Sequence, residues 1–243
     1  MQEHRIVFSG ALGRMGRALL PGLREAEGIE VVGEIDKDDD LVQVVRDAKA
    51  DTVVDFTQPD AAMPNARAII EAGACGVIGT TGFEPSDLEA LDREAREAGT
   101  GLLVAPNFAL GMILLQRFAE QAALHFPDVE VIEAHHTAKL DAPSGTALAT
   151  ARRIAEAGGR AAANTADPSR GLVVDGVPVH SIRLPGVVAR QEVFFGGQGE
   201  RLRLEHDTTD RTCFLPGVIE GIRRMPGRVG LVHGLDKLLF DDA

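Results

Sequence analysis

The first hundred residues alternate short apolar runs with stretches that have the spacing of amphipathic helices. Strand-length apolar runs cover 4–9, 29–35, 52–56, 76–79 and 101–105, and helical spacing follows Gly10 and covers 60–72 and 86–98. The first of these helices contains Pro21, where we expect a kink or a break because proline has no amide hydrogen to donate. Strands that alternate with helices are typical of a parallel sheet with crossover helices, so this region predicts a doubly wound α/β domain.

The pattern changes after Pro106, because several strand-like runs now follow one another. Helical spacing covers 111–125 and 145–157, and strand-like runs cover 129–134, 177–184, 190–196 and 201–206. We expect no crossovers between these strands, and therefore a second, α+β domain over 108–215 with a mixed or antiparallel sheet. The segment 161–171 is polar and contains glycine and proline, which predicts a mobile loop.

The composition and charge of the chain disfavour several classes of protein. Apolar residues make up 44% of the 243 positions, and no apolar run approaches the roughly 20 residues of a membrane-spanning helix. The start MQEHRIVFSGALG lacks the features of a secretory signal, so we expect a soluble cytoplasmic protein. Cys75 and Cys213 form no Cys-x-x-Cys pair, which disfavours disulfide scaffolds and thiolate zinc sites. A formal charge of −12 disfavours nucleic-acid binding.

A glycine turn follows the first predicted strand. In GALGRMG, Gly10, Gly13 and Gly16 stand where backbone amides can meet a pyrophosphate at a helix N-terminus. The spacing is G-x-x-G-x-x-G, so the glycines are equally compatible with a tight turn that binds nothing. Asp36 ends the second predicted strand, where an acid of a Rossmann-like fold accepts hydrogen bonds from the adenosine ribose.

The residue after Asp36 bears on the choice of cofactor. An acid at this position favours NADH, whereas the adjacent cation Lys37 offsets repulsion of a 2′-phosphate and admits NADPH, so we expect use of both. The alternative is that DKDDD is only a solvated acidic loop. Two further turns, GTTGF (79–83) and APNFALG (105–111), fall at strand ends and either face the nicotinamide or merely cap helices. The candidate cofactor-binding residues are Gly10, Ala11, Leu12, Gly13, Arg14, Met15, Gly16, Asp36, Lys37, Gly79, Thr80, Thr81, Ala105, Pro106, Asn107 and Phe108.

Candidate proton-transfer and anion-binding residues are concentrated in EAHHTAKLDAPSGTA, residues 133–147. His135, His136 and Lys139 follow an apolar strand, and Ser144 is placed to cap a helix that begins near Gly145. The amides of that first turn, together with Lys139, form a candidate site for a carboxylate. The alternative is an ordinary capped helix without a ligand. The spacing matches no zinc site, and Ser144 lies in no G-x-S-x-G nucleophile elbow.

This segment contains without a gap the signature E-[aliphatic or Ala]-H-H-x-x-K-x-D-A-P-S-G-T-A. On it the chain resembles the 4-hydroxy-tetrahydrodipicolinate reductases (dihydrodipicolinate reductases) of bacterial lysine and diaminopimelate biosynthesis. The resemblance spans the whole chain, through GALGRMG, VVDFTQP, GTTGF, APNF, QEVFFGGQGERLRLEHD and RTCFLPGV. The G-x-x-G-x-x-G spacing is the one that this family has.

The resemblance implies an oxidoreductase that transfers hydride from NADH or NADPH to C4 of an unsaturated dicarboxylate ring. It implies that His135 and Lys139 donate or accept protons, and that the substrate carboxylates are bound by His136, Lys139, Ser144, Gly145 and Thr146. It also implies a nucleotide domain of residues 1–107 plus 216–243, a hinge near Asn107, and a homotetramer joined through the sheets of the 108–215 domains. No metal is expected.

Two other functions remain open at this point. Another nicotinamide-dependent dicarboxylate reductase would share the turn at Gly10 but would not need His-His-x-x-Lys ahead of Ser-Gly-Thr. A protein that binds NAD(H) and reports it to a partner without turnover would have no need of Lys139.

Overall fold

The computed structural model describes residues 3–126, 128–160 and 167–240, and the chain divides into two compact units. The first unit consists of residues 1–110 and 211–243, and the second of residues 111–210. The last part of the chain therefore returns to the unit in which the chain begins.

The first unit is built on a parallel six-stranded sheet, which confirms the predicted Rossmann-like, doubly wound class. Its strand order is β11-β5-β4-β3-β1-β2, so the order reverses between β1 and β3. The central strands are short and buried on both faces, as continuous apolar runs in parallel sheets are. The strands are β1 (His4–Ser9), β2 (Ile29–Ile35), β3 (Thr52–Asp55), β4 (Cys75–Ile78), β5 (Gly101–Val104) and β11 (Gly230–His233).

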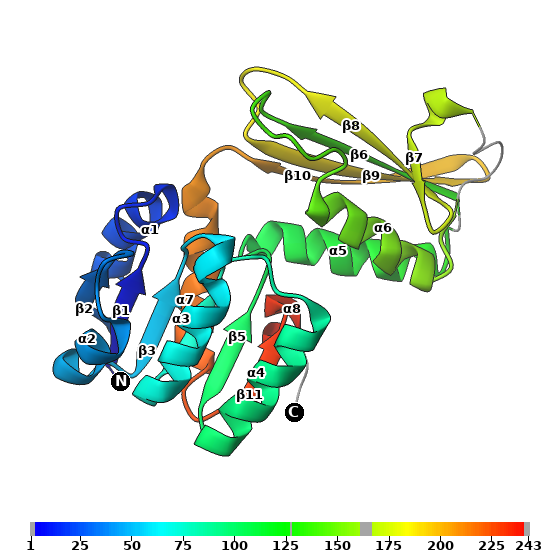
Figure 1. The fold of residues 1–243 in the computed structure, drawn as a ribbon. Helices are drawn as coiled ribbons and strands as arrows, with labels where there is room; N and C mark the ends of the chain where they lie inside the picture. Colours follow the sequence, from blue (N-terminus) through cyan, green and yellow to red (C-terminus); the bar gives the residue numbers. More distant parts are fainter. Residues whose placement is uncertain (1–2, 127, 161–166, 241–243) are drawn as a thin grey trace. The chain divides into compact units, whose positions relative to one another are not determined.

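Helices pack in two layers against this sheet (Figure 1). One layer consists of α2 (Leu41–Ala48), α3 (Pro59–Ala72) and α4 (Pro85–Ala98), and the other of α1 (Arg14–Glu25), α7 (Leu215–Arg224) and α8 (Leu235–Phe240), with the 3-10 turn η2 (Arg211–Phe214) beside α1. Of the kink or break expected at Pro21, the break does not occur, because α1 continues through this residue. Pro21 is exposed, so the carbonyl that loses its amide partner is close to water.

The second unit is a five-stranded mixed sheet, which confirms the predicted α+β architecture. Its order is β10-β9-β6-β8-β7, and α5 and α6 lie on one face of it (Figure 1). The expectation that no crossovers occur is wrong at one place, because β6 and β8 pair in parallel and α6 crosses between them. The elements are α5 (Leu110–Ala123), β6 (Asp128–His135), α6 (Gly145–Glu156), the 3-10 turn η1 (Pro168–Arg170), β7 (Leu172–Val174), β8 (Val177–Arg183), β9 (Ala189–Gly197) and β10 (Glu200–Thr208).

Strand alternation in the second unit places one row of side chains under the helices. Val131 pairs with Val193 and Val179 in the neighbouring strands, and all three side chains are buried. Of the loop expected over 161–171, residues 161–166 lie outside the described part of the chain. No helix in the described segments has the length and apolar character needed to cross a bilayer.

Candidate functional site

The glycine turn lies where the strand order of the first unit reverses, and ligands of doubly wound sheets bind in the crevice at this position. Gly10 follows β1 with φ of +86°, and a Cβ atom there would lie 2.4 Å from the carbonyl oxygen of Phe56. A Cβ on Gly16 would lie 2.2 Å from the carbonyl oxygen of Ala11. Both positions therefore require glycine, and the turn leads directly into the N-terminus of α1 at Arg14.

Asp36 follows β2 and lies beside this turn. One of its carboxylate oxygens accepts a hydrogen bond from the backbone amide of Leu12 at 3.0 Å, which links the end of β2 to the glycine turn. The amide of Asp36 donates to Asp39, so the acidic segment is an ordered turn that leads to the Asp40 cap of α2. Lys37 is exposed next to it.

The turn after β4 packs against the turn after β3. A Cβ atom on Gly79 would lie 2.0 Å from the ring of Phe56, so glycine is required here as well. Beyond it, a cavity of about 250 Å³ contains the predicted residues Thr80, Thr81 and Pro106. Gly82 and Phe83, of the predicted GTTGF turn, also line it. The rest of the lining, which was not among the predicted cofactor residues, comprises Pro85, Leu88, Val104 and His233. Its volume suits a single ring better than a whole dinucleotide.

A buried carboxylate that sequence reasoning missed organises these turns. Asp55 ends β3, is fully buried, and accepts hydrogen bonds from the hydroxyl of Thr57 at 3.0 Å and the amide nitrogen of Asn65 at 2.8 Å. The hydroxyl of Thr80 also donates to Asp55, and the backbone amide of Thr57 donates to the Thr80 hydroxyl at 2.7 Å. Asp55 therefore joins the turn after β3 to the turn after β4. An acid that ends an otherwise apolar strand, as in VVDF, is the signal that could have revealed it.

The segment Ala105–Phe108 follows β5 in the same unit. Ala105 and Phe108 are buried, and the ring of Phe108 lies 5.5 Å from that of Phe56 between centroids. The side-chain oxygen of Asn107 accepts from the amide of Ala109 at 2.9 Å, just before α5 begins. Pro106 is exposed and contributes to the cavity.

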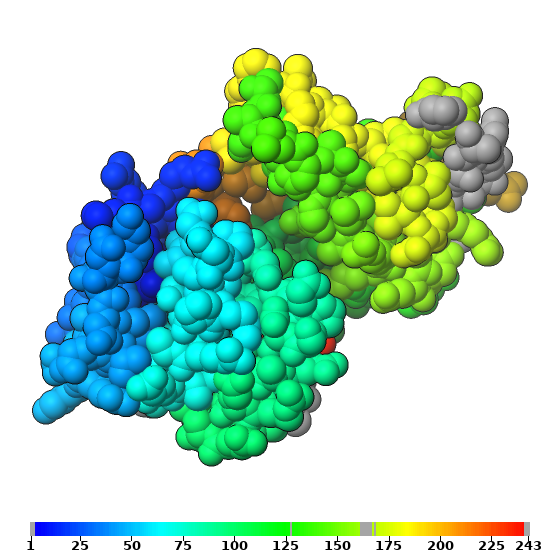
Figure 2. All heavy atoms as spheres, viewed as in Figure 1, coloured from blue at the N-terminus to red at the C-terminus, as the bar shows by residue number. Residues whose placement is uncertain are grey.

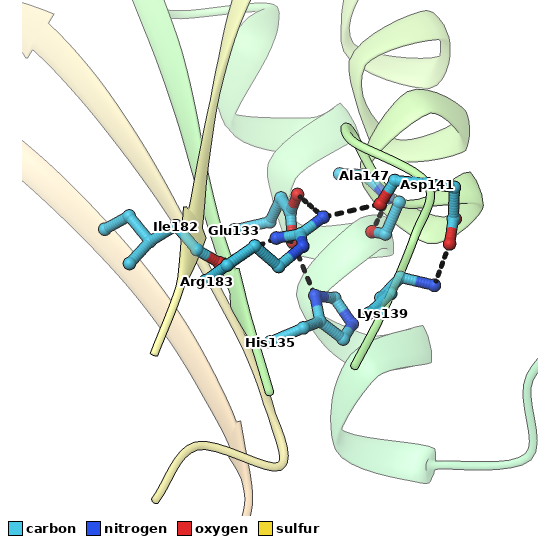
Figure 3. Close-up of polar contacts among 8 residues, drawn as sticks. Glu133, His135, Lys139, Asp141, Ala147, Ile182 and Arg183 are labelled. Carbon is cyan, nitrogen blue, oxygen red and sulfur yellow. Dashed lines mark hydrogen bonds and ion pairs between the residues drawn. The ribbon is translucent and has the colours of Figure 1, made fainter. Parts of the chain in front are cut away.

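In the second unit, Glu133 forms the centre of a polar cluster (Figure 3). Its carboxylate lies under the helices with no exposed side-chain area, and Arg183 at the end of β8 donates to both oxygens, at 2.8 and 3.0 Å. The Nδ1 atom of His135 is hydrogen bonded to the same carboxylate. Burial alone would raise the pKa of Glu133, but hydrogen bonds from His135, Arg183 and Ser181 lower it to about 2. Because Glu133 is ionised and can only accept, Nδ1 of His135 carries a proton.

Lys139 lies on the loop that connects β6 to α6. Its ammonium forms an ion pair with Asp141 at 2.9 Å, and the hydrogen bond from Lys139 lowers the pKa of the Asp141 carboxyl. At one end of the second unit this loop lies beside the connection after β8, green against yellow in Figure 2. Two hydrogen bonds join them: the Arg183 guanidinium donates to the carbonyl of Asp141, and the amide of Leu184 donates to the carbonyl of His135. His136, half-buried, accepts the amide of Lys139 through its own carbonyl.

The N-terminus of α6 is capped as predicted. The hydroxyl of Ser144, which is buried, accepts from the amide of Ala147 at 3.2 Å, while Gly145 and Thr146 begin the helix. A second feature was not foreseen: the hydroxyl of buried Thr150 donates to the Thr146 carbonyl and accepts from the side-chain amides of Gln116 and Gln191. These bonds tie the first turn of α6 to α5 and to the sheet.

The structure thus groups the predicted residues into two clusters, one in each unit. The cofactor candidates surround the strand ends of the first unit, and the histidine, lysine and serine candidates surround the loop between β6 and α6. Within the described ranges no group of three or more His, Cys, Asp and Glu side chains is arranged to hold a metal ion.

A glycine turn at the reversal point of a parallel sheet, combined in one chain with a mixed sheet that carries ionisable side chains, defines a two-domain protein of the dinucleotide-binding fold class. Sequence models of dihydrodipicolinate reductase match almost all of the chain, the N-terminal region over residues 4–108 and the C-terminal region over residues 111–239. The chain belongs to the dihydrodipicolinate reductase family.

Individual relatives agree with this family membership. The chain is 48% identical to the 4-hydroxy-tetrahydrodipicolinate reductase of Nocardia farcinica and 43% identical to that of Mycolicibacterium smegmatis, in each case over 97% of this chain and 98% of the relative. Among solved structures, the dipicolinate-bound dihydrodipicolinate reductase of Paenisporosarcina sp. TG-14 is 35% identical, with a TM-score of 0.88 over 97% of this chain and 99% of that one.

Proposed function

We propose that this protein reduces 4-hydroxy-tetrahydrodipicolinate, through dihydrodipicolinate, to tetrahydrodipicolinate with NADH or NADPH, in lysine and diaminopimelate biosynthesis. The observation that carries the proposal is the cluster of His135, Lys139 and a capped helix N-terminus at the end of β6. Relatives that bear the name of this activity, and a similar structure with dipicolinate bound, support the choice of substrate.

The first unit fits a dinucleotide cofactor. At Gly10, Gly16 and Gly79 a Cβ would collide with the protein backbone or with Phe56, so glycine is required to form these turns. The turn that contains Gly10 leads into the N-terminus of α1, where backbone amides can bind a phosphate. Asp36 would bind the ribose hydroxyls, and the cavity lined by Thr80, Thr81 and Pro106 would receive the nicotinamide ring. The cofactor, when bound, supplies the hydride. The acid–cation pair Asp36–Lys37 leads us to expect that both NADH and NADPH are used.

The second unit fits a dicarboxylate. The amides of Gly145 and Thr146 lie at the positive end of α6, Lys139 on the preceding loop adds positive charge, and the ring of His136 can donate a hydrogen bond. Asp141, which holds Lys139, has 58% of its side-chain area exposed, and exposed ion pairs contribute only about 0–1 kcal/mol. A substrate carboxylate can therefore compete with Asp141 for the ammonium.

Proton transfer falls to His135 and Lys139. Since Glu133 occupies Nδ1 of His135, proton exchange with the substrate takes place through Nε2. Lys139 supplies the proton that the reduced ring needs at C3. A hinge near Asn107, just before α5 begins, and a cytoplasmic location complete this part of the proposal.

The homotetramer also belongs to the proposal. Among the described residues, no helix covers the face of the second sheet opposite α5 and α6. This face carries Arg190 and Arg203, both paired with Glu192 and Glu205, and a hollow of about 490 Å³ beside Phe194. Light scattering on the purified protein checks this: we expect the mass of four chains, and a monomer at micromolar concentration would contradict it.

A coupled assay with freshly prepared 4-hydroxy-tetrahydrodipicolinate tests the activity, with NADH and NADPH supplied separately. We expect turnover with both cofactors and affinities within about a hundredfold of each other. Lys139→Ala should lower kcat by on the order of a hundredfold or more and leave cofactor affinity nearly unchanged. Absence of turnover in the unmodified protein would remove the proposal, and full turnover in Lys139→Ala would remove the role of this lysine.

A further inference from the structure

Arg183 is the residue whose contacts link the two proton-transfer candidates. It ends β8, and its side chain has 19% of its area exposed. Its terminal nitrogens donate to both oxygens of Glu133, which in turn holds His135. The same guanidinium donates to the carbonyl oxygen of Asp141 at 2.7 Å, two residues after Lys139 (Figure 3).

The four hydrogens on the two terminal nitrogens of Arg183 are all bonded to other protein atoms. Nη1 donates to Glu133 and to the carbonyl of Ile182 at 2.6 Å, and Nη2 donates to Glu133 and to the carbonyl of Asp141. These bonds use all four hydrogens of the two terminal nitrogens. The remaining donor, Nε, is buried and bonded to no other described atom. A substrate carboxylate would therefore find the terminal donors occupied and the remaining Nε donor buried, so we assign this arginine no substrate-binding role.

The loop that carries Lys139 has few apolar contacts to hold it. Thr137, Ala138, Asp141 and Ala142 are exposed, and Leu140 is 97% exposed. Such a segment depends on polar links for its conformation. The bond from Arg183 to the Asp141 carbonyl joins it to the rigid end of β8.

We propose that Arg183 is a positioning residue for proton transfer: through Glu133 it orients His135, and through the Asp141 carbonyl it holds the loop that carries Lys139. The expected effect on kcat rests on the proposed function, whereas the expected effects on hydrogen exchange and on the histidine tautomer do not. The planar fork of arginine is required, because one lysine ammonium cannot bind both oxygens of Glu133 and the Asp141 carbonyl with the same geometry.

Arg183→Lys keeps the charge and removes the fork. We expect kcat to fall by roughly 10- to 100-fold, because small misplacement of reacting groups has effects of this size, with KM for NADH within about twofold. Hydrogen exchange of backbone amides over residues 136–143 should become about tenfold faster. Arg67→Lys is the matched control: Arg67 binds Glu94 through a similar fork, at 3.0 and 3.1 Å, but on the exposed surfaces of α3 and α4. It should change neither kcat nor the exchange of 136–143.

Unchanged kcat and exchange in Arg183→Lys would overturn the inference, and so would a loss of kcat without faster exchange in the loop. If the unmodified protein has no reductase activity, the proposed function fails, while the exchange measurement still decides whether Arg183 holds the loop.

Glu133→Gln tests whether the Arg183–Glu133 pair orients His135, and it remains informative if Arg183→Lys does not fold. The single amide oxygen of Gln should turn to the Arg183 fork, so that its NH₂ group faces Nδ1 of His135. The proton of the neutral imidazole should then move from Nδ1 to Nε2, which nitrogen-15 NMR of labelled histidine detects. The same tautomer in both proteins would show that the Arg183–Glu133 pair does not orient His135.

Discussion

Glu133 should make the second unit sensitive to acid. Its carboxyl has a pKa of 4.5 in the unfolded chain and about 2 in the folded protein, because bonds from His135 and Arg183 outweigh its burial. A depressed native pKa stabilises the fold above the unfolded value, and this contribution is lost as pH falls from about 4.5 toward 2. The full contribution is about 3 kcal/mol, and linkage gives a loss of about 1 kcal/mol between pH 5 and pH 3.5.

Glu133→Gln isolates this effect, since Gln does not titrate and every other carboxyl is retained. The chain has no Trp or Tyr to report unfolding by fluorescence, so native-state hydrogen exchange of β6 and β9 amides is the assay. Between pH 5 and pH 3.5 the opening free energy of these strands should fall by about 1 kcal/mol more in the unmodified protein than in the variant. Equal losses within about 0.3 kcal/mol would refute the depressed pKa of Glu133.

Three further substitutions, two of them paired with a control substitution, test the remaining parts of the site. Gly10→Ala should lower NADH affinity at least about tenfold, because the new Cβ would collide with the turn after β3. The control Gly73→Ala also has a positive φ, +75°, but no atom lies within 4 Å of its Cβ position, so it should bind NADH normally. Calorimetry measures both affinities. Thr146→Val should raise KM for the dicarboxylate much more than it lowers kcat in steady-state assays, and the opposite pattern would argue against a ground-state contact. Thr150→Val should destabilise the second unit by roughly 2–4 kcal/mol in denaturant titrations, because the buried side-chain amides of Gln116 and Gln191 lose their acceptor. The control Thr100→Val should be nearly neutral, because the buried Thr100 hydroxyl has no hydrogen-bond partner among the described residues.

The sequence by itself determined the local elements and the residue types of the site. The apolar runs predicted the observed bounds of β1 and β2, and the helical spacing over 60–72 and 86–98 corresponds to α3 and α4. These predictions succeed because a strand buried on both faces of a parallel sheet appears in the sequence as a continuous apolar run, and a helix buried on one face appears as apolar residues with helical spacing. The cap at Ser144 was equally readable, because it depends only on residues three positions apart.

Only the tertiary structure decided how distant residues act together. Arg183 lies 50 positions from Glu133 in sequence, and the two meet because β6 and β8 pair in parallel. Thr150 joins Gln116 and Gln191 across three elements, and Asp55 joins the turns after β3 and β4. None of these partners has a fixed spacing from the other, so no periodicity or motif in a single chain can indicate them. Strand register, which is set by packing of the whole sheet, brings them within hydrogen-bond distance.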